Sequence, residues 1–190
     1  KMDNTEQRSD EWFEQRRGRF TASEIYRILG KSTLKTTKKS IDTFAFEKAI
    51  EVVYGVYKED VFSKDIQRGV EQEPLAFDLF CERKALDFVQ VNKCGFYPYE
   101  GNSGASPDGL VGEDGILEIK CPRREKFFRS QLMEKEDIEI KYYAQMQMQM
   151  LSTNRDKAYF VNYYIENGVE FMSEIIIPRD EEMIELIKER

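Results

Sequence analysis

The sequence predicts one domain of the mixed α/β (α+β) class, in which a central mixed β-sheet is flanked by helices. Three observations support this prediction. The 190 residues are enough for one domain with a sizeable core. Hydrophobic residues make up 41% of the chain, which is typical of globular proteins. Helix-like segments precede and follow a block of short strand-like segments. We therefore expect a single domain over residues 1–190.

The N-terminal half is predicted to be helical. Apolar periodicity and termination signals predict helices over residues 9–17, 21–29, 41–53 and 65–84. Thr21-Ala-Ser-Glu24 has the pattern of a capping box, and Gly30 is expected to end the helix that follows it. Residues 31–39, which are rich in Lys, Thr and Ser, are expected to form a loop. Pro74 predicts a bend or a separate turn within the helix over residues 65–84.

From residue 88 the pattern changes to short strand-like segments. Strands are predicted over residues 88–91, 95–99, 110–111 and 116–120, and Gly112-Glu-Asp-Gly115 is expected to form a hairpin turn. Residues 138–151 are predicted to be helical. Residues 158–165 and 169–177 are predicted to form a hairpin around Asn167-Gly168, and residues 179–190 a final amphipathic helix.

The composition limits the chemistry that this chain can perform. It contains no histidine, which excludes catalytic triads with an imidazole base and zinc sites of the HExxH kind. Carboxylates must then do much of the work, and they favour hard cations such as Mg²⁺ or Mn²⁺. Three widely spaced cysteines fit no disulfide framework, so we expect a reducing, cytoplasmic setting. We expect no membrane span and no signal or transit peptide.

Basic residues are concentrated in two segments, although the net charge is −7. Residues 15–39 contain eight cations against the single anion Glu24, and residues 119–132 contain five against Glu125. One such segment alone is usually a solvated face. Two that converge on a single site would instead form a surface for nucleic acid.

Glu118, Lys120 and Asp108 are the strongest candidates for a catalytic site. Glu118 and Lys120 lie two residues apart on a predicted strand, so both side chains point to one face, and Leu117, Ile119 and Cys121 point to the other. Asp108 starts the preceding strand, across the hairpin. Two carboxylates beside an amine suit metal-assisted hydrolysis of a phosphodiester. Lys120 would orient or deprotonate the water or stabilise the transition state, and the sequence leaves these roles open. The alternative is an ordinary surface salt bridge and turn.

Four blocks of sequence surround these residues. They are Trp12 with Arg16-Arg-Gly-Arg-Phe-Thr-Ala-Ser-Glu24; Arg68-Gly-Val-Glu-Gln-Glu-Pro-Leu-Ala76; Ser106-Pro-Asp-Gly-Leu110 with Leu117-Glu-Ile-Lys-Cys-Pro122; and Ala144-Gln-Met-Gln147. In order and content they resemble the phage lambda exonuclease family, with the YqaJ-like viral recombinases, in the PD-(D/E)xK nuclease superfamily. The resemblance implies a restriction-endonuclease-like core and a Mg²⁺-dependent deoxyribonuclease that degrades one strand of double-stranded DNA from its 5′ ends.

The resemblance also implies roles for single residues. It implies a catalytic set of Asp108, Glu118, Lys120 and Gln147. It implies that a metal site, with two Mg²⁺ ions or Mn²⁺, is formed by Glu73, Asp108, Glu118 and Ile119. A pocket for the 5′ phosphate is implied for Arg16 and Ser23, beside a helix start capped by Thr21 and with Trp12 stacking on the terminal nucleotide. Glu73 is preferred to Glu71, which lies on another side of the helix.

Gln145, Gln147 and Gln149 alternate with methionines, which is typical of a strand, whereas the resemblance and the length of the segment over residues 138–151 favour a helix. In a helix, Gln147 shares a face with Tyr143 and Met150, whereas Gln145 and Gln149 share another face.

The partners implied by the resemblance are double-stranded DNA ends, further copies of the chain in a homotrimer that encloses DNA, and a single-strand annealing protein. The host cytoplasm is the expected location if the chain is encoded by a phage. Two alternatives remain: a nuclease of the same fold with another polarity or with endonuclease activity, and a DNA-binding module without catalysis.

Overall fold

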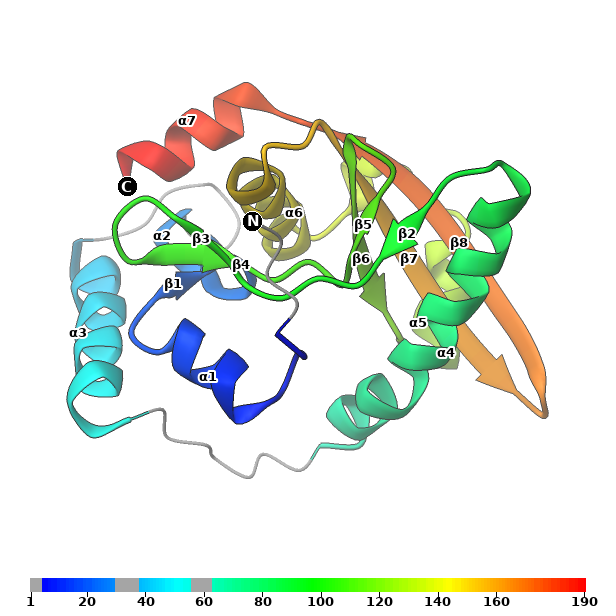
Figure 1. Cartoon of the computed structure of the whole chain (residues 1–190), viewed down its shortest axis with the longest axis horizontal. Coiled ribbons are helices and arrows are strands. Elements are labelled where there is room, and N and C mark those ends of the chain that lie inside the picture. Colours follow the sequence, from blue (N-terminus) through cyan, green and yellow to red (C-terminus); the bar gives the residue numbers. More distant parts are fainter. Residues whose placement is uncertain (1–4, 30–37, 56–62) are drawn as a thin grey trace.

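The computed structural model describes residues 5–29, 38–55 and 63–190 (Figure 1). The helices are α1 (Asp10–Arg16), α2 (Tyr26–Leu29), α3 (Lys38–Tyr54), α4 (Lys64–Leu86), α5 (Arg124–Ser130), α6 (Ile140–Thr153) and α7 (Glu181–Glu189), with 3-10 helices η1 (Ala22–Glu24) and η2 (Lys135–Asp137). The strands are β1 (Phe20–Thr21), β2 (Val91–Asn92), β3 (Tyr97–Tyr99), β4 (Ser103–Ala105), β5 (Gly109–Val111), β6 (Gly115–Lys120), β7 (Lys157–Glu166) and β8 (Val169–Pro178). The predicted mixed α/β class is confirmed.

The larger sheet has the strand order β2-β5-β6-β7-β8 and is mixed, because β6 and β7 are parallel and the other pairs antiparallel. Helices α4 and α6 pack on its two faces. Leu117 and Ile119 of β6 join Phe77 and Phe80 of α4 in one core cluster. Ile116 of β6 and Phe160 of β7 pack against Met146 and Met150 of α6 in a second cluster. The alternation of side chains along β6 thus divides it between two cores.

A smaller sheet, in the order β1-β4-β3, holds the N-terminal part of the chain against α6. A third core cluster lies beside it and contains Phe44 of α3, Met148 of α6 and Ile184 of α7. Gly104 of β4 must be glycine, because a Cβ atom there would lie 2.3 Å from the Phe96 ring and 2.6 Å from the carbonyl oxygen of Tyr97. Beside this sheet, η1 contacts α6 and β4.

The predicted hairpins and most of the predicted helices are found. Asn167 and Gly168 have φ angles of 52° and 77°, as a two-residue hairpin turn of this type requires. The β5–β6 hairpin lies where it was predicted. Helix α4 continues through Pro74 without a break, so the separate turn is wrong. The proline ring lies on the exposed side of the helix, where water can satisfy the carbonyl group that loses its partner.

Other predictions need correction. Phe88 is not in a strand: it has φ 57° and is 99% exposed in the turn that follows α4, and β2 starts only at Val91. Strands β1 and β4 and helix α5 were not predicted. Helix α5 buries Phe127 against Tyr164 of β7, a tertiary contact that the charged sequence around it concealed. Gly30 and most of the predicted loop over residues 31–39 lie outside the described residues, and residues 38 and 39 begin α3.

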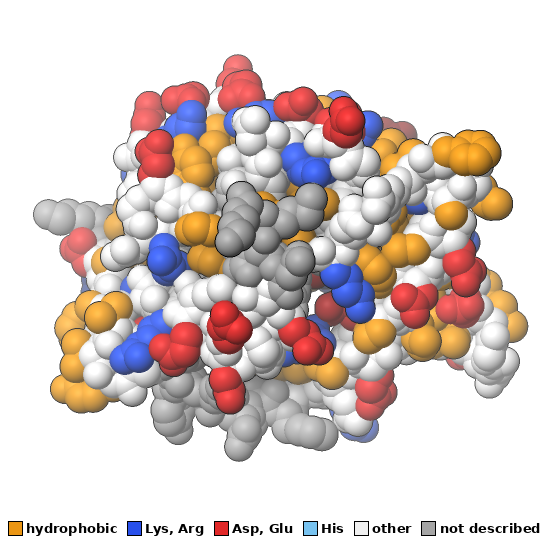
Figure 2. All heavy atoms as spheres, viewed as in Figure 1, with side chains coloured by type: hydrophobic (Ala, Val, Ile, Leu, Met, Phe, Trp, Pro, Cys, Tyr) orange, Lys and Arg blue, Asp and Glu red, His pale blue; other side chains and the backbone are white. Residues whose placement is uncertain are grey.

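Exposed apolar side chains gather at two ends of the molecule, over α3 and after α4 (Figure 2). They include Phe46, Val53 and Tyr54 at the first end and Leu86 and Phe88 at the second. Within the described parts of the chain, no helix combines the length and the apolar character needed to cross a membrane.

Candidate active site

Glu118 lies at the centre of the site, on the middle strand of the larger sheet. Its carboxylate is only 2% exposed and has three donors. Lys120 and Gln145 both donate to Oε1, Gln145 over 2.8 Å, and Gln149 donates to Oε2 over 2.6 Å. Burial alone would lower the pKa of Lys120, but the charges of Glu118 and Asp108 outweigh it and raise this pKa above its usual value. Lys120 is therefore an ammonium group at neutral pH.

Asp108 comes just before β5 and is fixed across the hairpin. Its backbone N–H donates to the carbonyl oxygen of Leu117 over 2.9 Å, and its Oδ2 accepts from the N–H of Ile119 over 2.6 Å. Burial raises the pKa of Asp108 well above its usual value, and the negative charges of Glu118 and Glu73 raise it further. The structure thus brings Asp108, Glu118 and Lys120 together, with an excess of carboxylate charge.

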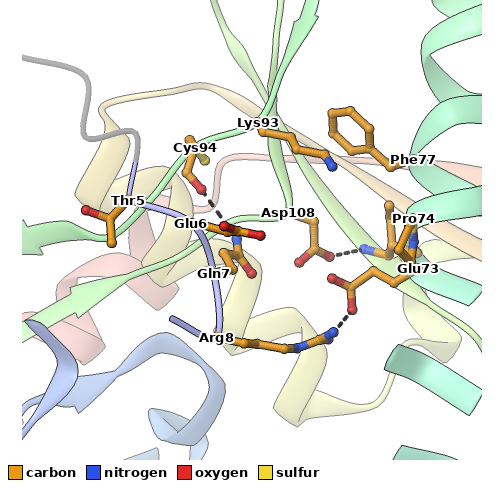
Figure 3. Close-up of a pocket in the computed structure, with 11 residues that line it drawn as sticks. Thr5, Glu6, Gln7, Arg8, Glu73, Pro74, Phe77, Lys93, Cys94 and Asp108 are labelled. Carbon is orange, nitrogen blue, oxygen red and sulfur yellow. Dashed lines mark hydrogen bonds and ion pairs between the residues drawn. The ribbon is translucent and has the colours of Figure 1, made fainter. Parts of the chain in front are cut away.

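Glu73 reaches the same place from α4. It forms an ion pair with Arg8, whose NH2 lies 2.6 Å from Oε2 (Figure 3). Arg8 has φ 70°, a backbone conformation that is unfavourable for residues other than glycine. The segment that carries it is held by Gln7, which donates to the carbonyl oxygen of Pro107 over 2.7 Å. Glu71, by contrast, is exposed and accepts from Gln67 along the helix, as expected.

The donor atoms suit a hard divalent cation. Asp108, Glu118 and Glu73 supply carboxylate oxygens, the type of ligand that Mg²⁺ and Mn²⁺ prefer. Burial, with the neighbouring charges of Glu118 and Glu73, raises the pKa of Asp108, and a bound cation would offset this cluster of negative charge. Among the described residues, however, no three side chains are arranged as a ready metal cluster. The cations of Arg8 and Lys120 instead pair with two of the three carboxylates.

Three cavities meet at these carboxylates, because Glu73 and Ile119 line all of them. The cavity drawn in Figure 3 has a volume of about 370 Å³ and lies under the N-terminal segment. A second, of about 420 Å³, has a lining of both charges, in which Arg68 pairs with Asp65, Lys126 pairs with Glu139, and Arg123 lies beside them. The third, of about 210 Å³, opens toward α1 and η1.

The third cavity contains the predicted phosphate pocket. The guanidinium group of Arg16 lies 4.1 Å from the centre of the Trp12 ring and 3.4–3.5 Å from the hydroxyl oxygens of Thr21, Ser23 and Ser106. No ion pair among the described residues includes Arg16. Burial lowers its pKa to about 10, although the charges of Glu24 and Glu51 oppose this. Arg16 is therefore a partly buried cation with three hydroxyl groups around it, an arrangement that fits an anion. Sequence reasoning missed Ser106, which also accepts from Trp12 Nε1 over 2.9 Å.

The capping box predicted for Thr21 is wrong. The Thr21 hydroxyl makes no capping bond, and a 3-10 turn, η1, follows it. The Glu24 carboxylate binds Lys48 at 2.6 Å and Arg27, and it accepts from the Thr21 hydroxyl over 3.5 Å. The Thr21 hydroxyl also lies near Arg16 and Ser23.

Gln147 does not reach the site, and its predicted catalytic position is corrected here. Its side chain donates to the carbonyl oxygen of Pro178 over 3.1 Å and accepts from the N–H of Asp180 over 2.8 Å. The other face of α6 carries Gln145 and Gln149, which both bind Glu118. The spacing of the three glutamines in a helix places Gln147 on one face and Gln145 and Gln149 on the other. The orientation of α6 on the sheet determines which of these faces points toward Glu118.

The two basic segments converge only in part. From the first, Arg16 lies at the site, whereas Arg17 binds backbone carbonyl oxygens of α3 and Arg27 pairs with Glu24 and Glu47. Lys31 and Lys35 lie outside the described residues. From the second segment, Lys120, Arg123 and Lys126 line the second cavity.

A search of curated proteins found no match. The chain is similar to an alkaline exonuclease, LHK-Exo, from Laribacter hongkongensis, with 29% identity and a TM-score of 0.76 over 95% of this chain and 88% of that one. A structure of LHK-Exo in complex with dAMP matches equally well. A phage-related exonuclease from Haemophilus somnus 129PT, at 20% identity and a TM-score of 0.66, covers 90% of this chain and 89% of its own, and shares the fold.

The fold predicted from the PD-(D/E)xK resemblance is thereby confirmed. The family model for the YqaJ-like viral recombinase domain matches residues 11–156, which include the phosphate pocket, the carboxylates of Glu73, Asp108 and Glu118, and all of α6. The chain belongs to the family of YqaJ-like viral recombinase domains.

Proposed function

We propose that residues 1–190 form a single domain that is a metal-dependent exonuclease and hydrolyses DNA from its ends. The observation that carries this proposal is the meeting of Asp108, Glu118, Lys120 and Glu73 where three cavities join. Membership of the recombinase family and the likeness to LHK-Exo, described as an exonuclease, support the same activity.

In this proposal, Glu73, Asp108 and Glu118 hold one or two Mg²⁺ ions, or Mn²⁺. Ile119 takes part only through its backbone carbonyl group, since its side chain is apolar and buried. When bound, the metal polarises the scissile phosphate and lowers the pKa of its water ligand. Lys120 donates a hydrogen bond to Glu118 and stabilises negative charge on the reacting phosphate. Gln145 keeps Glu118 Oε1 in place.

The polarity of digestion follows from the pocket around Arg16. A terminal phosphate is a dianion near neutral pH, and Arg16 with the hydroxyl groups of Ser23, Thr21 and Ser106 offers matching donors. Trp12 would stack on the terminal nucleotide. We therefore infer a preference for 5′-phosphorylated ends and digestion from 5′ to 3′ on double-stranded DNA.

The biological setting that we propose is recombination of phage DNA, with a single-strand annealing protein as a partner and a homotrimer as the active assembly. The dAMP bound to LHK-Exo is a 5′ mononucleotide, the kind of product that such digestion would release.

The test is digestion of a linear duplex labelled at one 5′ end or one 3′ end, with Mg²⁺, against a closed circular DNA of the same sequence. We expect 5′ mononucleotides from the linear duplex, no cleavage of the circle, and no activity in EDTA. Glu118→Gln is expected to abolish cleavage while leaving DNA binding in Ca²⁺ intact. Cleavage of the circle would show an endonuclease, and undiminished cleavage by Glu118→Gln would refute the site.

A further inference from the structure

Helix α6 carries three glutamines that differ in their surroundings, and Gln149 is the least expected of them. Its side chain is fully buried, and its Nε2 donates to Glu118 Oε2 over 2.6 Å. Its Oε1 atom is buried too and has no hydrogen-bond partner. Gln145 binds the other oxygen, Oε1, which Lys120 also binds.

Stability alone does not explain a glutamine at position 149. A buried amide oxygen without a donor is unfavourable, because the water that it loses on folding is not replaced. The neighbouring buried positions of α6 are occupied by methionines, at 146, 148 and 150. Methionine has nearly the same length as glutamine and fills such space without an unsatisfied polar atom. The amide nitrogen of Gln149 is therefore the part of the side chain that needs an explanation.

The amide nitrogen of Gln149 makes a hydrogen bond that no other described side chain makes. Among the described residues, Gln149 is the one side-chain donor to Oε2 of Glu118, whereas Oε1 has two. A carboxylate with donors on both oxygens is unable to rotate about its last bond without breaking a hydrogen bond. Gln149 and Gln145 thus hold the two oxygens from one helix, two residues on either side of Gln147.

We propose that Gln149 is a positioning residue, which fixes the carboxylate plane of Glu118 for the divalent cation. This inference rests on the function proposed above. One lone pair of Oε2 accepts from Gln149, and the other stays available to a ligand. Without Gln149, Oε2 becomes a buried anion without a donor, and Glu118 turns toward the donors at Oε1. This change removes a preorganised metal ligand.

The test compares Gln149→Met with Gln147→Met. Both residues are fully buried and lie two positions apart in α6, and both substitutions replace an amide by a thioether of similar size. Gln147 binds Pro178 and Asp180 on the opposite side, so its replacement affects folding but not Glu118. Circular dichroism and thermal unfolding in EDTA establish that each variant is folded. Calorimetric titration with Ca²⁺, without turnover, then measures metal affinity directly.

We expect Gln149→Met to weaken Ca²⁺ binding by about 10- to 100-fold, the usual effect of losing a group that orients a metal ligand. The concentration of Mg²⁺ needed for half-maximal cleavage should rise by a similar factor, whereas KM for DNA should stay within about twofold. Gln147→Met should retain the wild-type Ca²⁺ affinity. If Gln149→Met does not fold, Gln149→Asn serves instead, since its shorter side chain keeps the amide but withdraws it from Glu118.

Wild-type Ca²⁺ affinity in a folded Gln149→Met protein, or an equal loss in Gln147→Met, would overturn the inference. These outcomes are distinct from failure of the proposed function, which would appear as a wild-type chain that neither binds Ca²⁺ nor cleaves DNA.

Discussion

Replacement of Arg16 by alanine tests the proposed end recognition. The guanidinium group has only long contacts to hydroxyl groups, at 3.4–3.5 Å, and stays protonated at neutral pH because its pKa is about 10. A phosphate in this pocket would give it a charge-assisted hydrogen bond, which contributes about 1.5–3 kcal/mol. Since 1.36 kcal/mol corresponds to a factor of ten, losing this contact should reduce discrimination by about 10- to 150-fold.

The assay is the ratio of kcat/KM for a duplex with a 5′ phosphate to that for the same duplex with a 5′ hydroxyl group. Arg16→Ala should bring this ratio close to one and leave activity on the hydroxyl end nearly unchanged. Arg17→Ala is the matched control, because Arg17 binds the carbonyl oxygens of Glu51 and Val52 and does not line the pocket. An unchanged ratio in Arg16→Ala, or the same loss in Arg17→Ala, would refute the assignment.

Three further predictions concern stability, metal binding and thiol chemistry. Lys48 is 6% exposed and binds Glu24 at 2.6 Å and Glu51 at 2.8 Å. Lys48→Met should therefore lower the free energy of unfolding by about 3 kcal/mol and Tm by about 6–12 °C. A change in Tm of under about 2 °C in calorimetry would contradict this prediction. Arg8→Ala frees Glu73 from a partly exposed ion pair and should tighten Ca²⁺ binding by up to about fivefold, whereas weaker binding would show that Arg8 assists the metal site. Burial, with the charges of Glu73 and Asp108, raises the pKa of Cys121 to about 12. At pH 8 the Cys121 thiol should therefore be alkylated on the order of 1000-fold more slowly in the native chain than in urea. Mass spectrometry of the Cys121 peptide measures this rate, and rapid labelling of the native chain would contradict the prediction.

The parts of the fold that local sequence determines were predictable. Asn167-Gly168 defines its turn because both residues must adopt positive φ angles, and the β5–β6 hairpin with Glu118 and Lys120 follows from strand alternation. Asp108 could be placed because a hairpin leaves few positions for the residue at its start. Such features depend on residues that are close to one another in the sequence.

The predictions failed where contacts between residues far apart in the sequence determine the structure. Thr21 and Glu24 match a capping pattern, but Lys48 from α3 takes the Glu24 carboxylate. Gln147 and Gln149 are equally compatible with a helix, and only the packing of α6 between two cores determines which one faces Glu118. Helix α5 depends on the burial of Phe127 against β7. No pattern within a short window contains such information.

Because β6 lies at the centre of the larger sheet, some residues of the site are fixed to that sheet and others come from segments outside it. Both edges of β6 are hydrogen-bonded to neighbouring strands, so Glu118 and Lys120 move only as the sheet moves. Glu73, Arg8 and Arg16 come from α4, the N-terminal segment and α1, which contact that sheet through side chains. In the proposed exonuclease, adjustment to a new DNA end would therefore occur in these outer segments while Glu118 and Lys120 of β6 stay in register.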